Sequence, residues 1–199
     1  MWVIKIGGSL SGDPLLPRWL ELITQLGGGR SVIVAGGGGF ADLARDAQAR
    51  WRFDDVTDQN MAVLAMAQTA YLLHGLHPAL QPARSESEIR AVLRRGRTAL
   101  WLPFELLRDT ADAITSWEVS ADSLALGLAQ RLDAERLVLV KSCPVDATLS
   151  HAELAEAGVL DRRFAALARD AAPPIEIFER SELDRARAML IGDVRVGAA

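Results

Sequence analysis

Two lysines and one aspartate carry most of the chemistry that this sequence can support. Lys5 and Lys141 each come at the end of an apolar run, in W-V-I-K and L-V-L-V-K, and Asp122 lies in S-A-D-S-L-A. A lysine at the C-terminal end of a buried strand has little structural purpose, but its ammonium group can bind phosphate as a point charge. An aspartate near two such cations can hold both of them. These residues predict a site for a negatively charged substrate.

Glycine-rich loops follow the first two predicted strands. Gly7 and Gly8 come directly after the first strand and are followed by Ser9, and Gly36–Gly39 follow the second strand. Glycines let main-chain N–H groups approach an anion, and a helix N-terminus behind the loop favours negative charge. Ser9 can add a hydroxyl donor or cap the next helix. We therefore expect two anion-binding loops.

Each of these features also has a purely structural explanation. Lys5 could extend out of an edge strand to reach water, and Asp58 and Asp122 could each cap the helix that follows. The second glycine loop also fits the dinucleotide fingerprint G-x-G-x-x-A, but a polar loop stands where that fingerprint needs a strand ending in an acid. The convergence of these residues, rather than any single motif, favours the functional interpretation.

The hydrophobic pattern predicts the elements that would bring these residues together. Because the opening is β-α-β, we expect a parallel sheet, whose strands all end at the same edge. Lys5, the glycine loops and Lys141 should therefore meet there. The expected strands are 2–6, 31–35, 99–102 and 137–140, and the expected helices are 16–26, 40–50, 59–76, 88–95 and 123–132.

Composition places the chain among ordinary globular proteins. It has 199 residues, half of them hydrophobic, and a formal net charge of −4. We expect a single domain that binds neither nucleic acid nor membrane, because there is no basic stripe and no apolar stretch of spanning length. Cys143 is the only cysteine, which excludes a disulfide framework. The absence of a signal-peptide pattern predicts a cytoplasmic protein.

Four segments, K-I-G-G-S, V-A-G-G-G-G, S-A-D-S-L-A and L-V-L-V-K, resemble the amino acid kinase family in sequence and in order. The likeness covers nearly the whole chain, and the end of the chain is most similar to the uridylate kinase branch. The resemblance implies an α/β fold, a three-layer αβα sandwich on a mainly parallel sheet. It also implies one kinase domain over 1–199, with an acceptor-binding lobe over about 1–130 and a nucleotide-binding lobe over about 131–199.

The resemblance assigns roles to particular residues. ATP would donate its γ-phosphoryl group, with Mg²⁺ bridging the phosphates, and we expect a homo-oligomer acting on a small-molecule phosphate acceptor. Lys5 would stabilise the transferring phosphoryl group, Asp122 would orient the lysines, and Lys141 would bind the ATP phosphates. The expected ATP-binding residues are Gly7, Gly8, Ser9, Lys141, Ser142 and Asp146, and the expected acceptor-binding residues are Gly36, Gly37, Gly38, Gly39, Asp58, Trp117 and Ser120.

The acceptor is predicted from one branch of the family. The short chain, with W-L-P followed by S-W-x-V-x-x-D-S, is similar to the branch that phosphorylates an aminomethylfuran phosphate, and this implies (5-(aminomethyl)furan-3-yl)methyl phosphate as acceptor. Asp54, Asp55 or Asp58 would meet its ammonium group, and Trp117 would pack on the furan.

Some segments depart from the family pattern and leave alternatives open. S-C-P-V-D-A stands after Lys141 where the family usually has V-D-G-V, and the glycines and paired aromatics usual before the catalytic acid are missing. A nucleoside monophosphate, an isoprenyl phosphate or an amino acid carboxylate therefore remains an alternative acceptor. A non-catalytic member that only binds a nucleotide or an anion is a further alternative.

Overall fold

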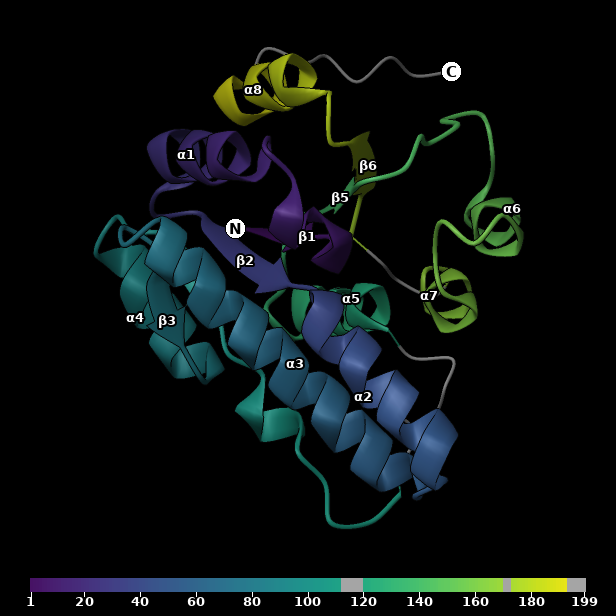
Figure 1. Ribbon diagram of the computed structural model, residues 1–199. Coiled ribbons are helices and arrows are strands. Elements are labelled where there is room, and N and C mark those ends of the chain that lie inside the picture. Colours follow the sequence, from purple (N-terminus) through teal and green to yellow (C-terminus); the bar gives the residue numbers. More distant parts are fainter. Residues whose placement is uncertain (112–119, 170–172, 193–199) are drawn as a thin grey trace.

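The computed structural model describes residues 1–111, 120–169 and 173–192. Within these ranges the chain forms one six-stranded sheet of order β3-β4-β2-β1-β5-β6, in which all neighbouring strands are parallel (Figure 1). The predicted α/β class with a mainly parallel sheet is thereby confirmed. The strands are β1 (Trp2–Ile6), β2 (Ser31–Ala35), β3 (Gln81–Ala83), β4 (Ala99–Trp101), β5 (Arg136–Lys141) and β6 (Ile175–Glu179).

Helices cover both faces of the sheet. In Figure 1, α1 and α8 lie on one side of the strands and α5 lies on the other, while α2 and α3 lie side by side. Among the described residues, no helix has the length and apolar character needed to cross a membrane. The α-helices are α1 (Leu16–Gly27), α2 (Gly38–Trp51), α3 (Asp55–Leu76), α4 (Glu86–Arg94), α5 (Ala121–Arg131), α6 (His151–Glu156), α7 (Arg162–Leu167) and α8 (Leu183–Ile191), and two short 3₁₀ helices are η1 (Gly8–Gly12) and η2 (Phe104–Leu106).

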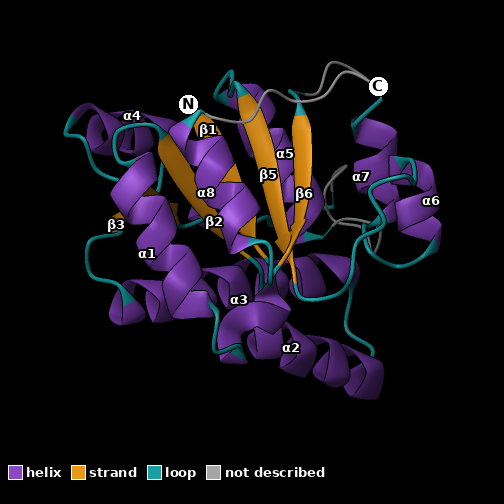
Figure 2. Cartoon of the chain, turned by 90° about the horizontal axis from the view of Figure 1, so that it is seen from above, coloured by secondary structure: helices purple, strands orange, loops and turns teal. Residues whose placement is uncertain are grey.

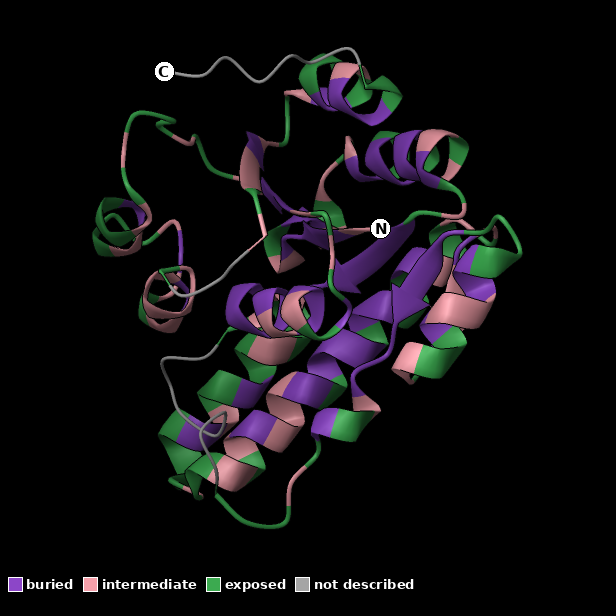
Figure 3. Cartoon of the chain, turned by 180° about the vertical axis from the view of Figure 1, so that it is seen from behind, coloured by how far each residue is buried: buried purple, intermediate pink, exposed green. Residues whose placement is uncertain are grey.

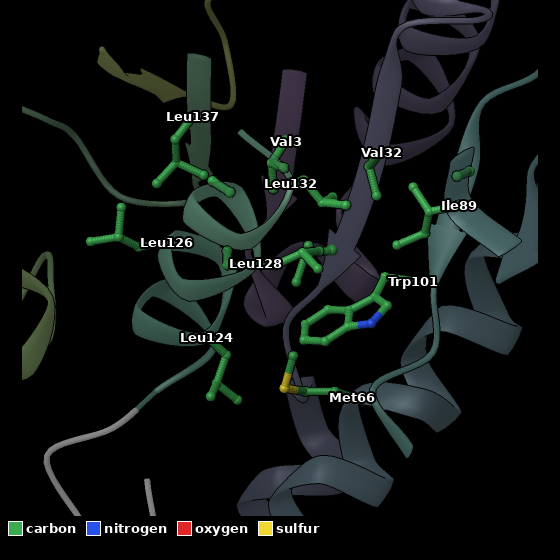
Figure 4. Close-up of a cluster of buried hydrophobic side chains, with 14 of the residues drawn as sticks. Val3, Val32, Met66, Ile89, Trp101, Leu124, Leu126, Leu128, Leu132 and Leu137 are labelled. Carbon is green, nitrogen blue, oxygen red and sulfur yellow. The ribbon is translucent and has the colours of Figure 1, made fainter. Parts of the chain in front are cut away.

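Two hydrophobic clusters, one on each face, hold the layers together. Side chains of β1 alternate between them, because Val3 belongs to the cluster under α5 while Ile4 belongs to the cluster under α1 and α8. Figure 4 shows the first cluster, in which Leu128 of α5 lies close to Trp101 of β4. Strands buried on both faces explain why the central strands read as continuous apolar runs.

The strand order sets the position of the site. β1 is the partner of both β2 and β5, and Lys5 lies opposite Val34 on one side and Leu139 on the other. In Figure 2 the strands run toward α2 and α3. The loops that follow β1, β2 and β5 therefore emerge next to one another, at the same edge of the sheet.

Helices α2, α3, α4 and α5 begin earlier than the sequence pattern predicted, and the starts of α3 and α5 decide which residues cap them. Helix α3 begins at Asp55 and not at Gln59, because the Asp54 carboxylate accepts a hydrogen bond from the Thr57 amide at 2.7 Å and caps it. Asp58 is therefore not the cap. Helix α5 begins at Ala121 and its cap is Ser120, so Asp122 does not cap it either.

Candidate active site

A buried cluster of Lys5, Asp122 and Lys141 lies at the C-terminal edge of the sheet. The Nζ atom of Lys5 is 2.8 Å from Oδ1 of Asp122, and Lys141 forms an ion pair with Oδ2 of the same carboxylate. All three residues are less than 10% exposed, which is rare for charged side chains. Lys141 also donates a hydrogen bond to the Val159 carbonyl at 2.6 Å. The structure therefore brings together the three residues predicted to be catalytic.

The cluster carries two positive charges and one negative charge. Burial by itself raises the pKa of the Asp122 carboxyl, but Lys5 and Lys141 outweigh burial and hold the pKa below its ordinary value. Burial, followed by repulsion from Lys5, lowers the pKa of the Lys141 ammonium, although Asp122 acts in the opposite direction. When both lysines are protonated, the cluster has an excess positive charge that an anionic ligand can neutralise.

The glycine loops beside this cluster pack backbone against backbone. A Cβ atom on Gly8 would lie 2.2 Å from the Gly38 nitrogen, and one on Gly36 would lie 2.5 Å from the Gly8 nitrogen. Gly38 also has a φ of +56°, which side chains disfavour. The loops thus need glycine at these positions in order to contact each other. Gly39 differs, because a Cβ atom there would meet nothing within 4 Å.

A cavity of about 320 Å³ opens beside Lys5 and the two loops. Its walls come from the glycine loops, from α2 and α3, and from the start of α5. Among the predicted acceptor-binding residues, Gly36–Gly38, Asp58 and Ser120 line it, whereas Gly39 does not. Gly8 and Ser9, which the sequence assigned to ATP, also line this cavity. The first glycine loop therefore lines the same cavity as the second one.

The wall of the cavity that α3 forms carries polar atoms without partners in the described part of the chain. Oδ1 of Asp58 and Nε2 of Gln59 are both buried and make no hydrogen bond to the rest of the described structure. Burial raises the pKa of the Asp58 carboxyl, Arg45 lowers it and Asp55 raises it, so that the net shift is upward. Buried polar atoms are normally satisfied. A ligand that supplies a donor to Asp58 and an acceptor to Gln59 would satisfy both.

Asp54 and Asp55 differ from Asp58 in their surroundings. Asp54 is exposed and occupied as the cap of α3, and Asp55 is exposed and lies 3.4 Å from Nε2 of Gln48. Neither lines the cavity. Of the three acids considered for the acceptor's amine, the structure places only Asp58 at the cavity.

The other side of the cluster, after β5, is more open. Ser142 shares a hydrogen bond of 2.6 Å with Ser9, which joins the ends of β1 and β5. Asp146 is exposed and accepts hydrogen bonds from the amide and hydroxyl groups of Thr148, which stabilise its own turn. Of the two predicted nucleotide contacts after Lys141, Ser142 lies beside the first glycine loop and Asp146 lies on the surface.

Sequence reasoning missed three residues around the site. Arg45 and Gln59 line the cavity, and Asp161 accepts hydrogen bonds from the first turn of α5. The only signal for Asp161 was its place before a short helical segment, as a possible cap. Trp117, predicted to contact the acceptor, lies outside the described residues.

The described residues do not include a preformed metal centre. Within the part of the chain that the structure describes, no group of three His, Cys, Asp or Glu side chains is placed to hold a metal ion. Asp122 contacts a lysine with each of its oxygens. A Mg²⁺ ion would depend on the phosphates of the nucleotide for its coordination.

Sequence comparisons find similarity to a known protein family and to a curated relative. The model of the amino acid kinase family matches residues 1–144. A curated relative, [5-(aminomethyl)furan-3-yl]methyl phosphate kinase of Methanocaldococcus jannaschii, is 26% identical over 148 residues, which are 70% of this chain. The matched part spans only 64% of that relative's length.

Solved structures show the same fold. The UMP kinase of Bacillus anthracis superposes with a TM-score of 0.71 at 16% identity, covering 96% of this chain and 91% of that one. The uridylate kinase of Archaeoglobus fulgidus gives a TM-score of 0.72 at 13% identity, covering 97% of this chain and 96% of that one. At such identities the likeness concerns the fold.

Proposed function

The chain belongs to the amino acid kinase family, and we propose that it transfers the γ-phosphoryl group of ATP to a small phosphate monoester. One observation carries this proposal: the buried cluster of Lys5, Asp122 and Lys141 lies between a cavity lined by glycine loops and an open loop after β5. Phosphoryl transfer depends mainly on positioning and on stabilising negative charge, and this arrangement can supply both.

Each member of the cluster has its own role. Lys5 lies between the cavity and Asp122, where its ammonium group stabilises the phosphoryl group in transit. Lys141 binds the ATP phosphates from the β5 side, together with Ser142 and Ser9. Asp122 is the orienting residue, because it contacts both ammonium groups and keeps two like charges close together. In this proposal most acceptor contacts come from residues before 130, whereas Lys141 and Ser142, which contact ATP, come after it.

We propose that the acceptor is (5-(aminomethyl)furan-3-yl)methyl phosphate. This proposal is supported by the relative from M. jannaschii, whose name contains this compound, and by the polar ends of the cavity. The amides of the Gly36–Gly38 loop bind the acceptor's phosphate near Lys5. Asp58 then meets the acceptor's ammonium group at the wall that α3 forms, where its Oδ1 atom has no partner within the described structure. A uridine nucleotide offers no cation for Asp58.

A panel of acceptors tests this function. ADP formation from ATP and Mg²⁺ is measured with the aminomethylfuran phosphate, its hydroxymethyl analogue, UMP, isopentenyl phosphate, carbamate and amino acid carboxylates at equal concentration. We expect turnover to require a phosphate monoester and to be best with the amine. Efficient turnover of a carboxylate, without turnover of any phosphate monoester, would contradict the proposal.

Asp58→Asn tests how the acceptor is held. The variant should raise the KM of the aminomethyl acceptor about 10-fold, which corresponds to a lost charged hydrogen bond, while the KM of ATP stays unchanged. The preference for the amine over the hydroxymethyl analogue should disappear. Asp46→Asn, an exposed acid on α2, is the matched control and should leave both constants unchanged. An unchanged preference in Asp58→Asn would exclude Asp58 from acceptor recognition.

A further inference from the structure

Asp161 accepts more hydrogen bonds than its own helix needs. It is the cap of α7, and its Oδ1 atom accepts from the Phe164 amide at 2.6 Å. It also accepts from the Ser123 hydroxyl at 2.6 Å, the Ser120 hydroxyl at 2.6 Å and the Ser123 amide at 3.3 Å. Three of the four donors therefore belong to the N-terminus of α5, which precedes Asp161 by about 40 residues.

These donors flank the central acid of the proposed active site. Ser120 and Ser123 lie on either side of Asp122 in the sequence, so Asp161 fixes the turn that carries the Asp122 carboxylate. Two residues before Asp161, the Val159 carbonyl accepts a hydrogen bond from the Lys141 ammonium group at 2.6 Å. The segment 159–161 thus contacts both Lys141 and the helix turn that holds Asp122.

This support comes from outside the strands of the sheet. Segment 159–161 lies between β5 and β6, in the region of α6 and α7 where many residues are exposed or half-buried (Figure 3). It also lies beyond residues 1–144, which the family model matches. The position of Asp122 relative to its two lysines therefore depends partly on a peripheral segment.

We propose that Asp161 is a positioning residue that keeps Asp122 between Lys5 and Lys141 during phosphoryl transfer. The chemistry of its side chain supports this role. An ionised carboxylate has two acceptor oxygens, whereas asparagine has one acceptor and places an N–H₂ group on the other side. At Asp161 that N–H₂ group would face either the Phe164 amide and the Ser123 hydroxyl, which now donate to Oδ1, or the Ser120 hydroxyl and the Ser123 amide, which now donate to Oδ2. The inference about turnover rests on the proposed kinase function, and it therefore needs one readout that is independent of turnover.

The first test compares Asp161→Asn and Asp161→Ala with wild type in steady-state kinetics. Because small displacements of catalytic groups cost up to about 100-fold in rate, we expect kcat to fall between about 10-fold and 100-fold, with the KM of ATP and of the acceptor changing less than about 3-fold. Ser123→Ala, which removes one of the four donors, should have a smaller effect of the same kind. The Ser123→Ala variant still tests the proposal if the Asp161 variants fail to fold.

The control is Ser85→Ala. Ser85 caps α4 through the Glu88 amide, far along the chain from the cluster, so that the variant also loses a helix cap. It should lower thermal stability while leaving kcat unchanged. If the Asp161 variants likewise lost only stability and kept their kcat, Asp161 would be a structural cap and the proposal would be wrong.

The second readout needs no enzymatic activity. Lys141 is buried, so in wild type it should be acylated slowly by acetic anhydride, as followed by mass spectrometry of its peptide. We expect Asp161→Ala to increase this acylation at least about 5-fold relative to Ser85→Ala, because a freed N-terminus of α5 exposes the cluster. If the wild-type chain showed no kinase activity and Asp161→Ala still increased the acylation of Lys141, the positioning role would be supported and the proposed function contradicted. Unchanged acylation together with unchanged kcat would overturn the positioning role alone.

Discussion

The two strands that carry the lysines leave the sheet in very different ways. After β1, Gly8 lies so close to Gly36 and Gly38 that neither loop has room for a side chain at the contact. After β5, the chain from Ser142 to Thr148 is exposed or half-buried, and its hydrogen bonds are the one from Ser142 to Ser9 and the turn of Asp146. Both lysines nevertheless reach the same carboxylate.

The glycine loops are therefore a preformed part of the site, whereas the loop after β5 is an open part. Contact between two backbones leaves no freedom for a loop to rearrange, and the cavity beside it is already formed. An exposed loop with few contacts opens easily and can adapt to a ligand. We infer that the acceptor side is preformed and that the nucleotide side takes its final shape around ATP.

The largest effect is expected from removing the ammonium group that the two sides share. Lys5→Ala should lower kcat at least about 100-fold, because a charge contact to the transition state is lost. The fold should persist, since Asp122 keeps its ion pair with Lys141. Turnover is measured as ADP release and folding by circular dichroism. Near-normal turnover in a folded Lys5→Ala protein would contradict the kinase assignment.

A smaller effect, on stability, should distinguish Gly8, which packs against backbone, from Gly39, which has open space around it. Gly8→Ala should lower the free energy of unfolding by about 2 kcal/mol, because the new Cβ atom would lie 2.2 Å from backbone. Gly39→Ala, in the first turn of α2, should instead raise it by about 0.5 kcal/mol, since a Cβ atom has open space there. Urea denaturation measures both. Equal effects would mean that the two loops do not depend on close backbone contact.

The sequence predicted the parts of this molecule that have strong periodic signals. The runs that became β1, β2 and β5 are apolar and β-branched, and their parallel order already placed Lys5, the glycines and Lys141 at one edge. Strand β3 was not predicted, because its three residues, Gln81–Ala83, include a proline and form an edge of the sheet. Helices α6 and α7 have six residues each, too few to show a period.

The site was less predictable than the fold, because its details depend on contacts between distant segments. Composition could indicate that glycines belong near a ligand, but not that Gly8 and Gly38 contact each other. Asp58 was identified as a candidate among three acids, and only the course of α3 separates it from its neighbours. Asp161 has no signal of its own beyond a helix cap, since its partners lie on α5.

The smallest effect is a change in pH dependence on the open side of the site. The pKa of Lys141 lies below the ordinary lysine value of 10.5, through burial and the neighbouring Lys5. As pH rises through this lowered pKa, Lys141 loses the charge that would bind the ATP phosphates. The rate of turnover should therefore fall at a pH below 10.5. In Lys141→Arg, whose guanidinium remains charged, this alkaline limb should move upward even though the maximal rate is lower.

The lowered pKa of Lys141 also makes the stability of the fold depend on pH. The pKa of Lys141 is lowered in the folded chain and has its ordinary value of 10.5 in the unfolded chain. At pH values between these two, Lys141 is protonated more often in the unfolded chain than in the folded one. The free energy of unfolding should therefore receive a contribution from Lys141 that rises with pH in this window, and Lys141→Arg should remove it. Urea denaturation of both proteins at several alkaline pH values measures the difference. If the two pH profiles had the same slope, and the alkaline limb of turnover stayed in place, Lys141 would not be the titrating group.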